Sequence, residues 1–527
     1  MNSMSKTNNK SLIKRIFSCE YTAILAVLAA CLLVGVIIVR DYGESWDESS
    51  EYSYGHYAIN AYQYFFHPQA LASYDVVTSI KLKGPAYFMF ADGSAGLLHL
   101  ILPAWSFINA SHFTNFAFYL VGIWIFYLLI RRWVQPWAAF GASLLFLFQP
   151  LFWGHSFINA KDIPYLVCFM TSIYLGFRMV DVKETPLKIC FVILAGVMLG
   201  LAFTIRVAGP LAGLIVLVYG FFQLRVRMIS RAIPYLLITL ATAYLSWPFL
   251  WSSPIEHFIV SFKTAEYYTY YTGRVLFMGK SYYPNHLPWT YFPALLSLQL
   301  TEPALLLAFA GLAILLISLS STQSREIFLL LLGWFLLPIT GIILIHSVLY
   351  DNGRQLYFLI PPIFFLPGVA LDRIFKLLTK PIFRIGLLAL IILPGIYASI
   401  RLHPYEYVYY NILVNGTGGA FRSYEMDYWG TSFTEAMEDV DRIAPRDAKI
   451  LVFGPKLTAR RYARPDLQVF VPIEGDVSNK HYDYVVLLNR HNLDETHCRD
   501  AQTVMTVSRK GAIFAVIKHV PPGVQCQ

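Results

Sequence analysis

The chain has 527 residues, of which 57% are hydrophobic and 16% aromatic, whereas only 14% are charged. This composition excludes a water-soluble globular protein, because so much apolar surface requires lipid as its solvent. The formal net charge is +9, and we attribute it to Lys and Arg at the ends of membrane helices rather than to a nucleic-acid-binding surface. Nucleic acid is therefore not expected as a partner.

Apolar segments long enough to cross a membrane recur along the chain. A bilayer core about 30 Å thick requires roughly 17 to 25 apolar residues per helix. Such segments lie at 22–39, 113–130, 137–152, 164–180, 190–205, 207–224, 233–250, 303–320, 327–346, 356–371 and 385–400. The stretch 84–104 is also apolar, but Gly84, Pro85, Asp92 and Gly93 interrupt it, so it is predicted to be interfacial or re-entrant. The expected fold class is a polytopic α-helical membrane protein with about eleven transmembrane helices.

The first apolar segment resembles a signal peptide, since Leu28-Ala29-Ala30-Cys31 looks like a bacterial lipoprotein cleavage box. The apolar run nevertheless continues past Cys31 to Val39 without a polar linker. We therefore interpret this segment as an uncleaved membrane anchor.

Basic residues predict the orientation of the helices, because cytoplasmic loops are enriched in Lys and Arg. If the N-terminus is cytoplasmic, the basic residues at the helix ends all fall on the cytoplasmic side. These residues are Lys14, Arg15, Arg131, Arg132, Arg178, Lys183, Lys188, Arg225, Arg227, Arg231, Arg325 and the run from Arg373 to Arg384. The opposite, outward side then receives loops 40–112, 151–163, 251–302 and 347–355 and the tail from 401. We expect a multi-pass protein of the inner (plasma) membrane whose C-terminal tail is extracytoplasmic.

The first outward loop begins with several carboxylates close to the membrane, in the run from Asp41 through Asp47 and Glu48 to Glu51. Neighbouring carboxylates beside Trp46 and a bilayer surface are suited to a general base or a cation ligand. A solvated acidic loop is the alternative.

The second outward turn contains Asn159, Lys161 and Asp162, followed by Pro164 at the start of the next helix. A carboxylate at a helix start is favoured by the helix dipole, so Asp162 could serve only as a cap. Lys161 is a candidate ligand for a phosphate group.

Two arginines are expected at the same outward boundary. Arg206 lies between two apolar segments, and Arg354 lies in the short loop 347–355. An arginine at this depth either extends to the lipid headgroups or binds an anionic substrate. Together with Lys161, the two arginines could converge on one anionic group.

The loop 251–302 is rich in aromatic residues, among them Tyr267, Tyr268, Tyr270, Tyr271, Tyr282, Tyr283, Trp289 and Tyr291. Tyr and Trp favour membrane interfaces. They also stack on sugar rings, which makes Tyr282 and Trp289 candidates for binding a sugar or an acceptor.

The tail from 401 differs in composition from the rest of the chain, because charged residues return. Short strands are expected at 449–454, 482–488, 503–508 and 512–518, and helices at 432–442 and 456–463. Gly454-Pro455 either cradles a phosphate or is an ordinary connection between a strand and a helix. We predict a small α/β domain over 401–527, next to a transmembrane domain over 1–400.

The positions of the cysteines and the lack of a nucleotide-binding motif argue against some functions. Cys19, Cys31, Cys168 and Cys190 lie in or beside apolar helices and suggest no metal site. Cys498 and Cys526 lie in the tail, where they either form a disulfide or remain two free thiols. The sequence has no Walker loop, which argues against a nucleotide-driven pump.

Five motifs in order resemble the GT-C superfamily of polyprenyl-phosphate-sugar glycosyltransferases, and most closely the bacterial relatives of the protein O-mannosyltransferases and aminoarabinose transferases. They cover most of residues 40–440. The motifs are Trp46-Asp47-Glu48, Asn159 to Pro164, Leu287 to Tyr291, Gly353 to Tyr357, and His403 to Asn411 followed by Tyr424 to Gly430.

The resemblance implies a membrane glycosyltransferase that moves a sugar from a polyprenyl-phosphate-linked donor to a hydroxyl of a protein, lipid or glycan acceptor. It implies Asp47 as the base, Glu48 and Asp162 as further catalytic carboxylates, and cations for the lipid phosphate. We assign the lipid phosphate to Lys83, Lys161, Arg206 and Arg354.

One departure from the family concerns a metal. Related aminoarabinose transferases have a Glu-Lys-Pro-Pro segment late in the first loop, where this chain has Leu82-Lys83-Gly84-Pro85. The sequence predicts no cofactor; the alternative is a divalent cation, for which Leu82 stands in place of the glutamate ligand.

Two other functions fit the same membrane architecture. A lipid-linked sugar flippase or other transporter would need polar residues along a path through the helices, but the middles of the helices are nearly free of charge. A non-catalytic subunit for envelope polysaccharide assembly would not need the outward carboxylates.

Overall fold

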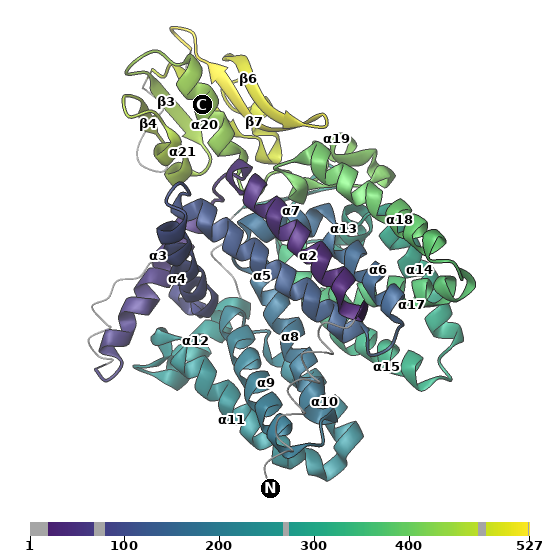
Figure 1. The fold of residues 1–527 in the computed structure, drawn as a ribbon. Helices are drawn as coiled ribbons and strands as arrows, with labels where there is room; N and C mark the ends of the chain where they lie inside the picture. Colours follow the sequence, from purple (N-terminus) through teal and green to yellow (C-terminus); the bar gives the residue numbers. More distant parts are fainter. Residues whose placement is uncertain (1–18, 68–79, 267–272, 473–480, 525, 527) are drawn as a thin grey trace.

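The computed structural model describes residues 19–67, 80–266, 273–472, 481–524 and 526. Helices form one large bundle, and a small domain with a β-sheet lies over one end of it (Figure 1). The helices of the bundle are α2 (Cys19–Ile38), α3 (Glu48–Asn60), α4 (Ala86–Ile101), α5 (Phe107–Ile130), α6 (Pro136–Leu147), α7 (Pro150–Ile158), α8 (Asp162–Asp181), α9 (Thr185–Ile205), α10 (Pro210–Leu224), α11 (Ile229–Leu245), α12 (Pro254–Glu266), α13 (Tyr291–Gln299), α14 (Glu302–Ile317), α15 (Thr322–Leu330), α16 (Leu337–Leu344), α17 (Pro361–Leu377) and α18 (Pro381–Leu402).

Seven helices of the described residues are long and apolar enough to cross a membrane, or up to ten if each of three bent pairs forms one span. One of the seven is the 36-residue unit Pro210–Leu245, which is much longer than a bilayer requires. Within this unit the chain is interrupted at Arg225, where φ is 51°. Every segment predicted from the sequence therefore has a counterpart, and the prediction of a polytopic helical membrane protein is confirmed.

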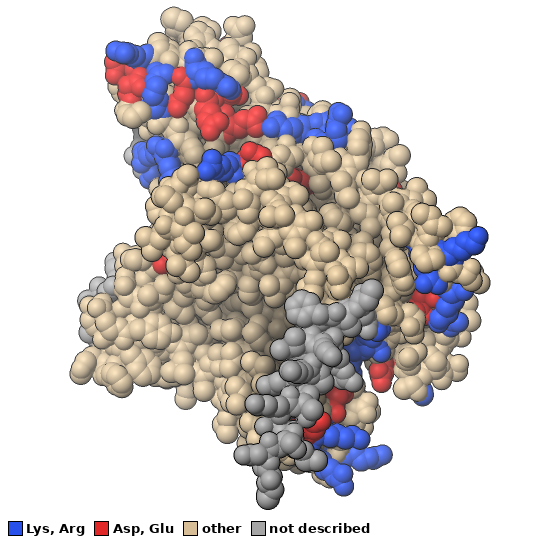
Figure 2. Space-filling view, in the orientation of Figure 1, with Lys and Arg blue, Asp and Glu red and all other residues tan. Residues whose placement is uncertain are grey.

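The surface agrees with this fold. Figure 2 shows a broad region with few charged side chains, and Lys, Arg, Asp and Glu gather above it and along its right and lower edges. Many large apolar side chains on the spanning helices are exposed, including Leu33, Ile37, Phe222 and Leu390. Lipid is the solvent that makes such exposure favourable. The chain is thus a multi-pass membrane protein.

Asp92 and Gly93 do not break the helix, because α4 runs from Ala86 to Ile101, and the interfacial or re-entrant placement of this stretch stays a prediction. Gly84 and Pro85 do mark a boundary, since they immediately precede the helix. With 16 residues, α4 is short for a span. It packs on α3, where a side chain at Gly55 would collide with the backbone of Phe88. This close pair holds the beginning of the first loop against the bundle.

The tail contains a five-stranded sheet with the order β4-β3-β5-β7-β6. β3 is parallel to β4 and β5, whereas β7 is antiparallel to β5 and β6. The elements of this domain are α20 (Ser432–Ile443), β3 (Lys449–Phe453), α21 (Lys456–Tyr462), β4 (Gln468–Phe470), β5 (Tyr484–Leu488), α22 (Leu493–Thr496), β6 (Gln502–Arg509) and β7 (Ala512–His519). The four predicted strands and both predicted helices are present, and β4 was not predicted.

Residues 403–431, including the short helix α19 (Gly416–Ala420), lie on the bundle rather than within the α/β unit. Gly154 of α7 touches the backbone of Tyr407 so closely that a side chain there would collide with it. The Trp46 amide donates to the Trp429 carbonyl over 2.8 Å. This segment therefore joins the α/β unit, which begins at α20, to the first loop.

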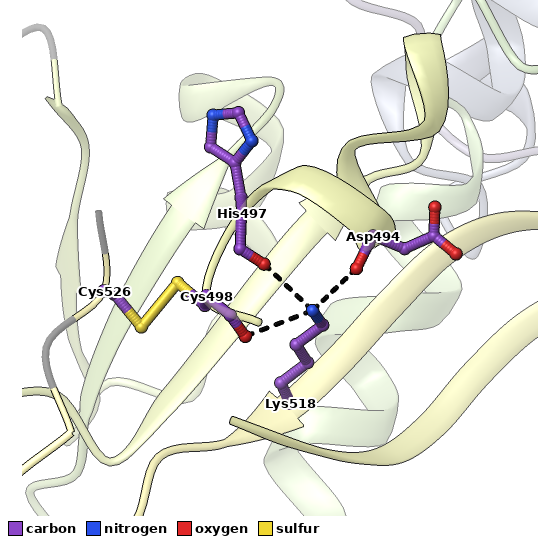
Figure 3. The surroundings of a disulfide bond; sticks show 5 residues. All are labelled: Asp494, His497, Cys498, Lys518 and Cys526. Atoms are coloured by element: carbon purple, nitrogen blue, oxygen red, sulfur yellow. Dashed lines mark hydrogen bonds between the residues drawn. A yellow bond between two sulfur atoms is a disulfide. The ribbon is translucent and has the colours of Figure 1, made fainter. Parts of the chain in front are cut away.

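A corner of the C-terminal domain is held by a disulfide and a buried ammonium (Figure 3). Cys498 and Cys526 are bonded, which selects one of the two alternatives that the sequence left open. The Nζ of Lys518 donates to the carbonyls of Asp494, His497 and Cys498 over 2.8, 2.9 and 3.2 Å. These contacts fix the chain from 494 to 498 against β7.

Candidate active site

Asp47 lies at the start of α3, yet its carboxylate does not cap that helix. A carboxylate at this position ordinarily accepts from the first helical amides. Here Oδ2 of Asp47 lies 2.9 Å from Nζ of Lys161, in the turn before α8. The Asp47 side chain is also 36% exposed, so a substrate can reach it.

Lys161 joins Asp47 to a second carboxylate. Its ammonium also contacts Oε1 of Glu51, one turn further along α3. Asp47 and Glu51 are four residues apart, so they share one face of the helix. The ammonium is thus held between two acids, and its side chain is 13% exposed.

Glu48 faces the other way, into the protein. Its Oε1 lies 2.7 Å from Nε2 of His112, and both side chains are fully buried. Its Oε2 accepts from the Ser45 amide over 2.8 Å. The structure therefore does not bring Glu48 beside the Asp47–Lys161 pair; it ties the start of α3 to α5.

Asp162 binds both predicted arginines. One carboxylate oxygen pairs with Nη2 of Arg206, and the other lies 2.7 Å from Nη1 of Arg354. Asn159 accepts from the Asp162 amide over 2.8 Å and so takes the capping role. The hypothesis that Asp162 is merely a cap is wrong.

Arg354 is held on several sides. Its Nε and Nη2 lie 3.1 and 3.0 Å from Oδ2 of Asp351. Its guanidinium lies 4.2 Å from the centre of the Trp429 ring, a cation–π contact. The arginine is almost completely buried, so its orientation is fixed before any substrate binds.

Lys83 reaches this region from the end of the first loop. The Gly84 amide donates to the Thr204 carbonyl over 2.7 Å, and a side chain at Gly84 would collide with Thr204. The Tyr54 hydroxyl donates to the Lys83 carbonyl over 2.9 Å. These contacts place Lys83 beside the end of α9, next to Arg206.

The charges of the cluster change one another's protonation. Burial would raise the pKa of Asp47, but Lys161 and Arg354 outweigh it and lower that pKa to about 2. Burial raises the pKa of Glu51 to about 7, although Lys161 opposes the rise. Burial, Lys161 and Arg206 together lower the pKa of Lys83 to about 7. At neutral pH Asp47 is ionised, whereas Glu51 and Lys83 are close to titration.

The two predicted aromatic residues are not part of this cluster. Tyr282 is half-buried in a small hairpin of β1 (Val275–Phe277) and β2 (Lys280–Tyr282). Trp289 is 70% exposed and lines a cavity of ≈ 340 Å³ between α13 and α16. None of the acids or cations described above lines that cavity. Tyr267, Tyr268, Tyr270 and Tyr271 lie outside the described residues.

The donor set does not fit a divalent metal. No group of three or more His, Cys, Asp or Glu side chains within the described ranges is arranged to hold one. Asp47 and Asp162 instead face lysine and arginine. Cations from side chains occupy the positions around these carboxylates, so we assign no step to a metal.

Sequence reasoning gave no site role to Asp351 and Trp429, and it named Glu51 only as one of the carboxylates of the first loop. Glu51 could have been found from its spacing to Asp47, because positions four apart on a helix are neighbours. Asp351 and Trp429 could not, because only the fold brings them to Arg354.

The chain is similar to known transferases. Residues 106–251 match the family described as dolichyl-phosphate-mannose-protein mannosyltransferase; this range includes Lys161, Asp162 and Arg206 but neither Asp47 nor Arg354. A comparison with curated protein sequences finds no match.

Two solved structures share the fold. ArnT from Cupriavidus metallidurans bound to undecaprenyl phosphate has 14% identity and a TM-score of 0.50, over 94% of this chain and 98% of that one. The Archaeoglobus fulgidus oligosaccharyltransferase tethered to an acceptor peptide has 12% identity and a TM-score of 0.50, over 92% of this chain and 70% of that one. The predicted resemblance is confirmed by a family match over residues 106–251 and by a fold shared with two solved structures.

Proposed function

We propose that the protein transfers a sugar from a polyprenyl-phosphate-linked donor to a hydroxyl acceptor at the outer face of the membrane, with inversion at the anomeric carbon. One observation carries this proposal: the partly exposed carboxylate of Asp47 contacts Lys161 at 2.9 Å, at the end of the bundle covered by the C-terminal domain. A base and a set of phosphate-binding cations are therefore adjacent where a membrane lipid can deliver its headgroup.

Asp47 is the general base of the reaction. Its ionised carboxylate takes the proton of the acceptor hydroxyl while the hydroxyl oxygen attacks the anomeric carbon. The bond from that carbon to the phosphate oxygen breaks, and the electron pair leaves with the lipid phosphate. A single displacement of this kind inverts the anomeric centre.

Cations stabilise the departing phosphate. Lys161, Arg206 and Arg354 surround Asp47 and Asp162, and Lys83 is close enough for Lys161 and Arg206 to lower its pKa. Positive groups that are held in place before the reaction stabilise developing negative charge most effectively. We assign all four to the phosphate.

Donor binding would also activate the base. Lys161 and Arg354 are the two largest charges that lower the pKa of Asp47, and Lys83 adds to them. When a phosphate shares these two cations, less of their positive charge acts on the carboxylate. The pKa of Asp47 then rises from its lowered value. Asp47 then becomes a stronger base only when a donor is present, which limits proton uptake in its absence.

The remaining predicted carboxylates act on position rather than on the proton. Glu48, bound to His112 and Ser45, fixes the turn that carries Asp47. Asp162 aligns Arg206 with Arg354. Neither has the exposure that acceptor attack requires.

The sidedness of the site follows from the positive-inside rule. The N-terminus is cytoplasmic, and the cluster and the C-terminal domain face outward from the inner (plasma) membrane. The acceptor is a protein, lipid or glycan that the C-terminal domain helps to admit. Tyr282 and Trp289, which lie away from the cluster, are left out of the sugar site.

The test is transfer by the purified protein. It would be incubated with a set of polyprenyl-phosphate sugars and an envelope extract as acceptor, and the product would be identified by mass spectrometry. Proton NMR of the product would give the anomeric configuration, which should be opposite to that of the donor.

The same preparation distinguishes the rival functions. Transport of the lipid-linked sugar across vesicles without transfer would indicate a flippase and overturn the proposal. Absence of both activities, with polysaccharide assembly unchanged when the outward acids are replaced, would indicate a non-catalytic subunit.

A further inference from the structure

Arg490 of the C-terminal domain reaches a carboxylate next to the candidate active site. Its Nη2 lies 2.6 Å from Oδ1 of Asp351 and 2.9 Å from Oε1 of Glu425. Asp351 and Glu425 are both buried, and Arg490 is 16% exposed. A domain outside the bundle thus supplies the counter-charge for two buried acids.

Asp351 divides its two oxygens between two arginines. Oδ1 faces Arg490, whereas Oδ2 lies 3.0 Å from Nη2 of Arg354. Arg354 continues to Asp162, which binds Arg206. Charges of alternating sign therefore run without a gap from the C-terminal domain to the phosphate-binding arginines.

The backbone at Asp351 indicates that this placement is imposed on it. Asp351, Asn352 and Gly353 have φ values of 50°, 56° and 68°. Non-glycine residues adopt this left-handed region at a cost, which is smallest for Asn and Asp, and they persist where the surroundings hold them. The Asn352 side chain donates to the Tyr410 hydroxyl over 2.9 Å, and Arg490 holds the neighbouring carboxylate.

The segment that carries Arg490 is itself held by several contacts. Asp494 forms a two-point ion pair with Arg422, at 3.0 and 2.7 Å. Lys518 binds three carbonyls between 494 and 498, and Cys498 is bonded to Cys526 (Figure 3). These contacts hold the backbone that carries Arg490 in place.

We propose that Arg490 is a positioning residue for the transferase reaction: by sharing Asp351, it aligns Arg354 for the donor phosphate. This proposal rests on the proposed function. Without Arg490, Asp351 and Glu425 face each other as buried like charges, and both oxygens of Asp351 become available to Arg354. The guanidinium then turns away from Asp162 and from the phosphate.

The test compares Arg490→Ala, Arg490→Lys and the control Arg499→Ala. Arg499 is exposed and contacts the Glu495 carbonyl. We expect kcat/KM for the donor to fall by up to about 100-fold in Arg490→Ala, because small misplacements of positioning groups cost on that order. Arg490→Lys should recover part of the loss, and Arg499→Ala should match wild type.

A double-mutant cycle separates positioning from general destabilisation. Arg490→Ala would be combined with Arg354→Lys, and both kcat/KM and binding of undecaprenyl phosphate would be measured on folded, purified protein. If Arg490 acts through Arg354, the two effects are less than additive. Additive effects, or an Arg490→Ala protein within twofold of wild type, would overturn the positioning role.

The two proposals fail in different ways. Wild-type protein that binds undecaprenyl phosphate but transfers no sugar overturns the proposed function. The double-mutant cycle measured on undecaprenyl phosphate binding then decides the role of Arg490 alone. Wild-type protein that binds no polyprenyl phosphate overturns both. If wild-type protein transfers sugar but the effects in the double-mutant cycle are additive, only the positioning role of Arg490 is overturned.

Discussion

Two turns at the end of the bundle covered by the C-terminal domain carry aspartates, and their environments are opposite. Asp47 lies before α3 with 36% of its side chain exposed and contacts one lysine. Asp162 begins α8, is 2% exposed, and binds two arginines and an asparagine. Both are acids at a helix start within one cluster of cations, but each pairs with different members of it.

The difference shows which acid can perform chemistry. A carboxylate whose oxygens are already occupied by two arginines cannot accept a proton without breaking those ion pairs, and buried pairs of this kind cost about 3–5 kcal/mol to break. Asp47 is partly exposed to solvent and pairs with a single lysine. The turn at Asp47 is therefore suited to catalysis, and the turn at Asp162 to holding cations in place.

The largest expected effect is on catalysis at the exposed turn. Asp47→Asn removes the proposed base but keeps the shape of the side chain, so we expect kcat to fall by about 10²–10⁴-fold. The melting temperature should stay close to that of wild type, because the side chain is partly exposed. Transfer rates and thermal unfolding of the purified protein measure both. Full activity in a folded Asp47→Asn protein would remove the distinction between the two turns.

Asp162→Asn should damage the fold as well as the reaction. It leaves Arg206 and Arg354 without their shared counter-charge, and uncompensated buried charge costs about 3–5 kcal/mol. We expect a clear fall in melting temperature together with weaker donor binding. Gln135→Ala, at an exposed position of the bundle, is a control for surface substitutions. A stable Asp162→Asn protein that loses only kcat would make Asp162 a catalytic acid instead.

Much of this comparison was visible in the sequence, and its decisive part was not. Apolar segments predicted the bundle, because lipid imposes helix length and backbone hydrogen bonding on each segment separately. Asp47, Lys161 and Asp162 were found because polar residues between such segments must lie at a membrane boundary. The partners of each acid depend on contacts across the chain, so Glu48 was grouped with Asp47 although its carboxylate binds His112.

Replacing Lys83 tests how much its positive charge contributes to donor binding beside the exposed turn at Asp47. Its pKa is lowered to about 7, so the lysine is positive below that pH and becomes neutral above it. Lys83→Met should raise KM for the donor by roughly tenfold at pH 6, in line with the ~1.5–3 kcal/mol of a hydrogen bond to a charged group. The defect should shrink above pH 8, where wild type has lost the same charge. A defect of constant size across this range would show that Lys83 does not titrate there.

Glu51 gives the smallest effect and the finest test of the exposed turn. Its pKa is raised to about 7, so it is neutral below that pH and negative above it. Once ionised, it competes with the donor phosphate for Lys161, and donor affinity of wild type should fall as the pH rises through 7. Glu51→Gln stays neutral and should bind the donor better than wild type at pH 8 by about fivefold, which corresponds to the ~1 kcal/mol of a partly screened charge pair. At pH 6 the two proteins should be equal. Donor affinity measured across this range would contradict the assignment if Glu51→Gln weakened binding at both pH values, because Glu51 would then hold Lys161 in place, as Asp162 holds its arginines.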